Sequence, residues 1–361
     1  MGMAATVVVG RCWVLGLAAI VVTVLPLLGL KSWWVRVWDF PRQQIVVVAA
    51  LAALGFLVLR GWPSGPEVVL LAALAAAMVL QLAQILPYTR FWRRQGSRAR
   101  APSDERSFRV LIANVLMTNR EVDRLVRILR EADPDIVLLL EPDRWWVDRI
   151  APVLPEHRFR VLHPLDNTYG MALLSRLELV EPELRFLLKE AIPSIRTRVR
   201  LRSGEEVLFY GVHPEPPSPT EADSSLPRDA ELVVIGREIA KETRPVVVAG
   251  DLNDVAWSHT SRLFRRLSGL IDPRIGRGFY NTFHADYRLL RWPLDHVFYS
   301  ADFLLRDLRR LPAFGSDHFP ILIGLAYHPP AAAEQPVAAA DREDRREAKE
   351  TVAEAVAEEA R

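Results

Sequence analysis

The chain has 361 residues, of which 50% are hydrophobic, and a net charge of +2. Its single cysteine, Cys12, excludes a disulfide framework and a zinc site built from cysteines. The length suits one or two ordinary domains, and the charge shows no strong basic excess.

The amino-terminal quarter contains three nearly continuous apolar runs, at residues 12–30, 43–59 and 68–86. Each has roughly 17 to 20 residues without a charged side chain, enough to cross the hydrocarbon core of a bilayer. Six of the ten tryptophans lie at or near the ends of these runs, where amphipathic rings favour the membrane interface: Trp13, Trp33, Trp34, Trp38, Trp62 and Trp92. We therefore predict three transmembrane helices. A cleaved signal peptide is the alternative for the first run, but that run is long and lacks a convincing small-residue cleavage site before Lys31.

Basic residues around the runs predict the orientation. Lys31, Arg36 and Arg42 lie in the first loop, and six arginines follow the third run: Arg90, Arg93, Arg94, Arg98, Arg100 and Arg106. With three crossings these segments share a side, whereas the loop 60–67 carries almost no net charge. The positive-inside rule then places the following large domain in the cytoplasm. The arginines could also bind nucleic acid or anionic lipid, but a topology signal suffices to explain them.

Residues 108–327 form a stretch large enough for one well-packed α/β domain. We predict strands at 109–113, 136–140, 171–174, 195–201, 207–212, 246–249, 296–299 and 321–325, and helices at 121–132, 229–241 and 258–267. This order indicates stacked sheets with outer helices. Ser203-Gly204 is typical of a hairpin turn, which predicts antiparallel pairing of the two strands around it.

The strand at 195–201 presents a basic face. Arg196, Arg198, Arg200 and Arg202 alternate there with apolar residues, so their side chains point the same way. A solvated outer face is the simpler interpretation, and a wall that binds anions is the alternative.

Two segments lack regular structure by composition. His213 is followed by Pro214-Glu215-Pro216-Pro217, which ends the strand and begins a stiff loop. That loop could lie over a cleft or could simply connect two elements. After Pro330 the chain turns to alanine, glutamate and arginine without a large apolar face, so we predict a solvated tail that is disordered or partly helical.

Polar side chains recur where the predicted strands begin or end: Asn114, Glu141, His213, Asp251, Asn253, Asp295, Asp317 and His318. Asp251 and Asn253 lie two residues apart, so on an extended chain their side chains point into one cleft. A carboxylate such as Glu141 after an apolar run is costly to bury unless it meets a cation. An aspartate beside a histidine can hold the imidazole in one tautomer and favour its charged form. Together these residues predict one composite site for a phosphate ester.

In this order the residues resemble the endonuclease/exonuclease/phosphatase superfamily of metal-dependent phosphodiesterases and phosphatases. The matching segments cover essentially all of residues 108–327: Ala113-Asn114, Leu140-Glu141-Pro142, Tyr169-Gly170-Met171, Val212-His213, Gly250-Asp251-Leu252-Asn253, Leu294-Asp295-His296 and Ser316-Asp317-His318-Phe319-Pro320. The resemblance implies an α/β fold, a four-layer α/β/β/α sandwich of two mixed sheets with one active site at the sheet rim. The segment His213 to Pro217 resembles the membrane-anchored bacterial branch.

The resemblance also implies roles for the residues. Glu141 would be the main ligand of Mg²⁺ or Mn²⁺, with Asn114 assisting and Asp317 near the metal. Asp251 would orient or deprotonate the attacking water, or serve the leaving group, and Asn253 and His213 would hold the phosphate. His318 would contact the scissile phosphate, with Asp295 orienting it. Some relatives have an acid two residues after the asparagine, where this chain has Leu116, so a second metal there is in doubt. Tyr169 matches a position that often touches phosphate, although packing explains it equally well.

The resemblance leaves the substrate open. A membrane-tethered nuclease acting on DNA or RNA would use the basic strand and the juxtamembrane arginines to follow a phosphate backbone. A lipid or small-molecule phosphoesterase is favoured by the three anchoring helices and by Trp145-Trp146, unless those tryptophans belong to the core. A catalytically inactive domain that binds a partner at the membrane is the third hypothesis. We divide the chain into a membrane anchor (1–90), a basic linker (91–107), a catalytic domain (108–328) and a charged tail (329–361).

Overall fold

The computed structural model describes residues 3–60, 63–100 and 104–359. The chain forms two compact units. The first comprises Met1–Trp92 together with Pro217–Ser225, and the second comprises Arg93–Pro216 and Leu226–Arg361. Each unit is described below by itself.

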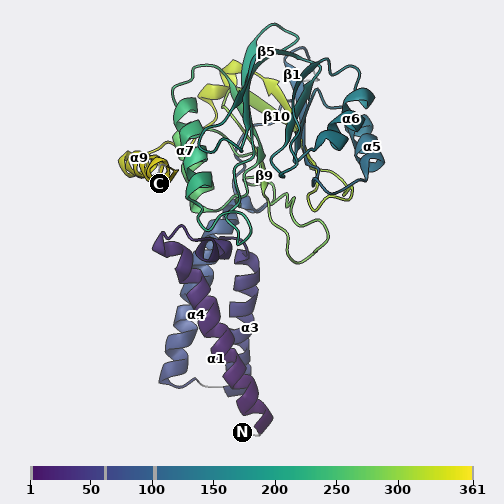
Figure 1. Cartoon of the computed structure of the whole chain (residues 1–361). Helices are drawn as coiled ribbons and strands as arrows, with labels where there is room; N and C mark the ends of the chain where they lie inside the picture. Colours follow the sequence, from purple (N-terminus) through teal and green to yellow (C-terminus); the bar gives the residue numbers. More distant parts are fainter. Residues whose placement is uncertain (1–2, 61–62, 101–103, 360–361) are drawn as a thin grey trace. The chain divides into compact units, whose positions relative to one another are not determined.

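The first unit is built on a bundle of the apolar helices α1, α3 and α4 (Figure 1). Its elements are α1 (Met3–Val24), η1 (Leu25–Leu28), α2 (Trp33–Arg36), η2 (Val37–Asp39), α3 (Arg42–Arg60), α4 (Gly65–Ile85) and η3 (Leu86–Tyr88). Three spans are long and apolar enough to cross a membrane: Thr6–Leu28, Arg42–Leu59 and Gly65–Tyr88. The prediction of three apolar helices is thus confirmed.

Polar contacts join the helices and a loop of the first unit. The Arg42 guanidinium donates to Gln81 Oε1 at 2.7 Å, and Gln81 Nε2 donates to Thr23 Oγ1 at 3.0 Å, so one buried hydrogen-bonded chain joins α3, α4 and α1. Part of the proline-rich loop also belongs here, because the Ser225 amide donates to the Lys31 carbonyl at 2.6 Å. That loop therefore pairs with the segment that follows η1.

The second unit contains two mixed β-sheets, and within the described residues these have six and five strands. The first has the order β10-β11-β1-β2-β4-β3, with β1 (Ser107–Asn114), β2 (Ile136–Leu140), β3 (Phe159–His163), β4 (Met171–Ser175), β10 (Phe303–Arg310) and β11 (Ile321–Tyr327). The second has the order β5-β6-β7-β8-β9, with β5 (Glu178–Arg185), β6 (Ser194–Arg200), β7 (Glu206–Val212), β8 (Val246–Asp251) and β9 (Asp295–Tyr299). The pairs β1–β2 and β7–β8 are parallel and the other neighbours are antiparallel. Antiparallel pairing of β6 and β7 through the turn at Gly204 confirms the predicted hairpin.

The two sheets pack face to face, and helices cover their outer faces (Figure 1). The helices of this unit are α5 (Val122–Ala132), α6 (Arg144–Val153), α7 (Leu226–Ile239), α8 (His259–Ser268), η4 (Pro329–Ala333) and α9 (Arg342–Glu359). β2 shows why the layers form: Leu138 joins the core between the sheets, while Leu139 packs in the cluster that contains α5 and α6. A strand buried on both faces must be apolar at every position, as this one is. The predicted four-layer α/β sandwich is confirmed.

The predicted strands and helices are present, and the structure adds α6, β3, β5 and β10. The three additional strands lie at sheet edges, so parts of their faces meet solvent and their apolar patterns are weak. β5 also contains Pro182 where its pairing with β6 shifts register. From Pro329 the chain forms η4 and then α9, in which Ala348 packs against Val233 of α7 and Leu263 of α8.

The basic face of β6 is neutralised. Arg196 lies near Glu183 and Glu242, and Arg198 pairs with Glu206 at 2.8 Å. Arg200 is bonded to Glu178 and Glu206, and Arg202 to Asp135. These pairs favour the solvated outer face over a wall that binds anions.

Residues 97–99 cover the outer edge of β10. The Leu305 amide donates to the Ser97 carbonyl at 2.8 Å, and the Ala99 amide donates to the Leu305 carbonyl at 3.0 Å. A Cβ on Gly96 would lie 2.4 Å from the Tyr299 hydroxyl oxygen, so only glycine allows this close approach. Part of the predicted basic linker therefore packs as an integral part of the second unit.

Candidate active site

Strand polarity brings the predicted site residues to one edge of each sheet. Asn114 ends β1 and Glu141 follows β2, its parallel neighbour. His213 follows β7, and Asp251 ends the parallel strand β8. Asp295 begins the antiparallel strand β9, where it is paired directly with Asp251.

Two glycines permit the close backbone approaches behind these residues. Gly250, with φ of +153°, would place a Cβ 1.9 Å from the Val212 carbonyl oxygen. A Cβ on Gly170 would lie 2.0 Å from the Pro142 carbonyl oxygen. Glu141 itself has φ of +60°, a left-handed conformation that is uncommon for a side-chain-bearing residue and directs its carboxylate away from the strand path.

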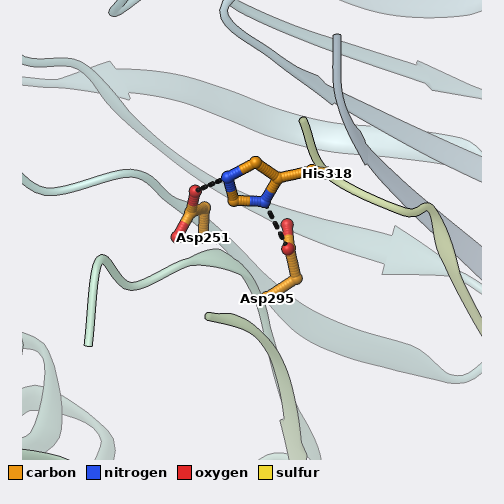
Figure 2. Close-up of side chains that lie close together, drawn as sticks. All are labelled: Asp251, Asp295 and His318. Carbon is orange, nitrogen blue, oxygen red and sulfur yellow. Dashed lines mark hydrogen bonds and ion pairs between the residues drawn. The ribbon is translucent and has the colours of Figure 1, made fainter. Parts of the chain in front are cut away.

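A charged histidine lies between two buried aspartates (Figure 2). His318 Nδ1 lies 2.7 Å from Asp295 Oδ2, and His318 Nε2 lies 3.5 Å from Asp251 Oδ2. Burial opposes the charged imidazole, but the two carboxylates outweigh it and raise the pKa of His318 to about 10. Burial alone would raise the pKa of Asp251, yet His318 and several hydrogen bonds hold that pKa below its usual value. His318 and Asp251 are therefore imidazolium and carboxylate at neutral pH, whereas burial raises the pKa of Asp295.

Glu141 lies on the other side of Asp251, joined to it by Asn114. Asn114 Nδ2 donates to Glu141 Oε1 at 2.7 Å and to Asp251 Oδ2 at 3.2 Å. His213 Nε2 lies 4.0 Å from Glu141 Oε1. Burial raises the pKa of Glu141 to about 7, although the hydrogen bond from Asn114 and the charge of His318 act in the opposite direction.

The remaining predicted residues lie at the borders of this cluster. Asn253 has φ of +50°, and its Nδ2 donates to the Pro214 carbonyl at 2.9 Å, directly after His213. Asp317 is half-buried, with Oδ1 at 3.4 Å from the Ser316 hydroxyl. The Tyr169 ring packs beside the His213 imidazole, with ring centroids 5.8 Å apart.

Sequence reasoning did not single out two hydroxyls that hold the cluster together. The Ser316 hydroxyl donates to the Asn114 carbonyl at 2.7 Å and accepts from the His318 amide at 3.0 Å, which links β1 to the histidine. Thr282 Oγ1 accepts from the Asp295 amide at 3.1 Å. Ser316 belongs to the recognised Ser-Asp-His motif, but nothing near Thr282 in the sequence signals its contact with β9.

Two donor sets could hold a divalent cation. Asp251, Asp295 and His318 lie close enough together to share an ion. However, an imidazolium offers no lone pair, so an ion there would have to displace the proton that both carboxylates stabilise. Glu141 fits better, because it is a hard oxygen ligand and burial raises the free energy of its ionised carboxylate, which a bound cation would offset. The roles of Glu141, Asn114 and Asp317 as ligands stay predictions.

The adjacent tryptophans 145 and 146 are structural. Trp146 is fully buried in the cluster beneath α5 and α6. The Trp145 ring contacts the guanidinium groups of Arg120 and Arg149, which lie 4.6 Å and 4.0 Å from its centroid. The pair thus belongs to the core and its cover, and it lends no support to a lipid substrate.

Comparison with known proteins agrees with the fold. The description "Endonuclease/Exonuclease/phosphatase family" belongs to a family model that matches residues 111–318. Similar solved structures include the human Nocturnin catalytic domain with bound sulfate anion, at a TM-score of 0.51 and 17% identity over 66% of this chain and 98% of that one. Humanized D. rerio TDP2 is similar at a TM-score of 0.50 and 18% identity, over 61% of this chain and 98% of that one. A search of curated proteins finds no match.

Proposed function

Because the chain belongs to the endonuclease/exonuclease/phosphatase family, we propose that it is a membrane-anchored, divalent-metal-dependent hydrolase of phosphodiesters or phosphomonoesters. One observation carries this proposal: a mostly buried carboxylate, Glu141, lies one asparagine away from the ionised Asp251, which itself faces the charged His318. We assign these residues the roles of metal ligand, proton acceptor and cationic donor, the combination that hydrolysis of a phosphate ester needs.

Each residue of the cluster has its own role in the proposed hydrolysis. Asp251 is ionised, because His318 and several hydrogen bonds lower its pKa, so its carboxylate can accept a hydrogen bond from the attacking water and orient it. We assign it that role or the role of proton acceptor. His318, held charged by Asp295, stabilises negative charge on the phosphate oxygens as it develops. Mg²⁺ or Mn²⁺ bound by Glu141, with Asn114 and Asp317 assisting, would polarise a phosphoryl oxygen.

His213 and Asn253 complete the proposed site. His213 is buried at the end of β7, and burial lowers the pKa of its imidazole, so at neutral pH it binds as a neutral donor. Asn253 lies beside it, with its amide fixed on the Pro214 carbonyl. We assign both residues to holding the phosphate while water attacks in line.

The neutralised face of β6 favours a lipid or small phosphoester over nucleic acid. A nuclease needs cationic side chains available to phosphates, and the four arginines of β6 and its turn are already paired with carboxylates. We also keep the domain boundaries at 90, 107 and 328 and the cytoplasmic side of the catalytic domain as proposals.

The test is hydrolysis by the purified full-length chain with Mg²⁺. We expect turnover of bis-p-nitrophenyl phosphate, and Glu141→Gln and Asp251→Asn should each remove most of it without unfolding the chain. Plasmid DNA, RNA and phospholipid vesicles identify the substrate class. A folded chain that hydrolyses none of these would favour the partner-binding role, and wild-type rates in both variants would overturn the site assignment.

A further inference from the structure

A loop beside the candidate active site carries exposed apolar side chains at its tip. Residues 282–292 run out from the second unit and return to β9 just before Asp295. The Thr282 and Phe283 amides both donate to the Trp292 carbonyl at 3.0 Å, and the His284 amide donates to the Leu290 carbonyl at 3.3 Å. The loop is therefore a short paired arm rather than an open connection.

The base of this arm is fixed on the catalytic cluster. Phe283 forms a β-bridge with His318, and their ring centroids are 5.0 Å apart. The Ala285 amide donates to the Asp317 carbonyl at 2.7 Å. Arm and catalytic histidine thus share backbone and ring contacts, so the arm is positioned by the same residues that position the site.

The end of the arm is Tyr287-Arg288-Leu289-Leu290, and its three apolar residues, Tyr287, Leu289 and Leu290, are here named the apolar tip. Tyr287, Leu289 and Leu290 are 58%, 84% and 46% exposed. Three large exposed apolar side chains thus lie within four residues, next to the exposed Arg288, at the end of a hydrogen-bonded arm. Such a local concentration of exposed apolar surface favours an interaction site. Scattered single leucines would carry no such meaning.

Charges around the tip suit a phosphate-bearing ligand. Arg291 donates to the Ala285 carbonyl at 2.6 Å, and its guanidinium lies 4.9 Å from the ring centroid of Phe319, next to His318. Arg310 lies over the same ring at 4.3 Å. Two guanidinium groups therefore contact the ring of Phe319, the residue that follows His318.

We propose that the apolar tip binds the acyl chain of an amphiphilic phosphoester, so that the substrate of the site is a lipid of the bilayer. This inference rests on the proposed function and names its substrate class. The chain supplies a second reason, since it carries three helices apolar and long enough to lie in that bilayer. A nucleic acid is the weaker fit, because bases stack on aromatic faces whereas two of the three tip residues are aliphatic.

The experiment compares two chromogenic esters that differ only in chain length, ethyl and octyl p-nitrophenyl phosphate. The full-length chain should prefer the octyl ester in kcat/KM, because its chain leaves water on contact with the tip. The double variant Leu289→Ser/Leu290→Ser should lower that octyl-to-ethyl ratio by about tenfold. The matched control is Leu162→Ser, an exposed leucine on β3, which should leave the ratio as it is.

Other outcomes overturn the inference. An octyl-to-ethyl ratio of kcat/KM near one in the wild-type chain would rule out the acyl site. The same ratio in the double variant as in the wild-type chain would also rule it out. Cleavage of a single-stranded oligonucleotide that falls in Tyr287→Ala would assign the tip to base stacking instead.

A binding measurement separates this inference from the proposed function. If the chain hydrolyses neither ester, the proposed function fails. Octyl phosphate should then still raise the melting temperature of the wild-type chain more than ethyl phosphate does, and the double variant should lose that difference. Equal shifts in both proteins would refute the acyl site on its own.

Discussion

The bond between Asp295 and His318 permits a quantitative prediction. The two side chains are buried and their bonded atoms are 2.7 Å apart, so Asp295→Asn removes a charge-assisted hydrogen bond while keeping the size of the side chain. Such bonds contribute about 1.5 to 3 kcal/mol, and the upper end applies to a pair shielded from water. We therefore expect kcat on bis-p-nitrophenyl phosphate to fall about 100-fold, since each 1.36 kcal/mol corresponds to a factor of ten.

The pH profile separates positioning from simple structural damage. In the wild-type chain the pKa of His318 is about 10, so the imidazolium should persist across the neutral and mildly alkaline range. Without the Asp295 carboxylate this pKa falls, and the alkaline decline in rate should move to lower pH. Asp148→Asn, at an exposed site on α6, is the control and should change neither quantity. A wild-type rate and profile in Asp295→Asn would refute the assigned role of the pair.

Four further predictions follow from the same structure. Chelation should abolish hydrolysis and Mg²⁺ or Mn²⁺ should restore it in the wild-type chain but not in Glu141→Gln, and metal-independent turnover would contradict the assignment. Burial raises the pKa of Glu231 to about 8 from an ordinary 4.5, so the chain should lose stability relative to Glu231→Gln as pH rises through that window, by about 1.4 kcal/mol per pH unit in denaturation experiments. A constant difference across that window would show that Glu231 does not titrate as described. Gly250→Ala should lower the free energy of unfolding by about 3 kcal/mol or more, because its Cβ would meet the Val212 carbonyl oxygen, and an unchanged melting curve would argue against that approach. A reporter fused after Arg361 should behave as cytoplasmic, and an extracytoplasmic signal would reverse the proposed orientation.

The sequence predicted the buried parts of the fold best. β2 and β8 are covered on both faces, so their residues form continuous apolar runs that end at Glu141 and Asp251. Edge strands such as β5 have one neighbouring strand and a solvent-exposed face, so their apolar residues alternate only weakly along the sequence. Contacts made by irregular loops are not encoded in any period, which is why the pairing of Thr282 with Asp295 could not be expected.

For the candidate site, the residues could be predicted from the sequence but their contacts could not. The identities of the charged residues could be predicted from the strand ends, and the structure links Glu141, Asn114, Asp251, His318 and Asp295 in one chain of pairwise contacts. The direction of each contact was not predictable, because it depends on the left-handed backbone at Glu141 and on the glycines behind it. The alternation of arginines in β6 was visible, but their carboxylate partners come from neighbouring strands and from beyond the sheet.

The pairing of residues 97–99 with β10 limits where the amino-terminal part of the chain can be removed. Removing everything before Phe108 would strip the backbone groups of Leu305 of their partners and open the surface over the Tyr299 hydroxyl. An exposed edge strand can pair with a strand of another copy of the chain, which leads to aggregation. A shortened protein that retains Arg93 onward should stay monodisperse, whereas one that starts at Phe108 should precipitate.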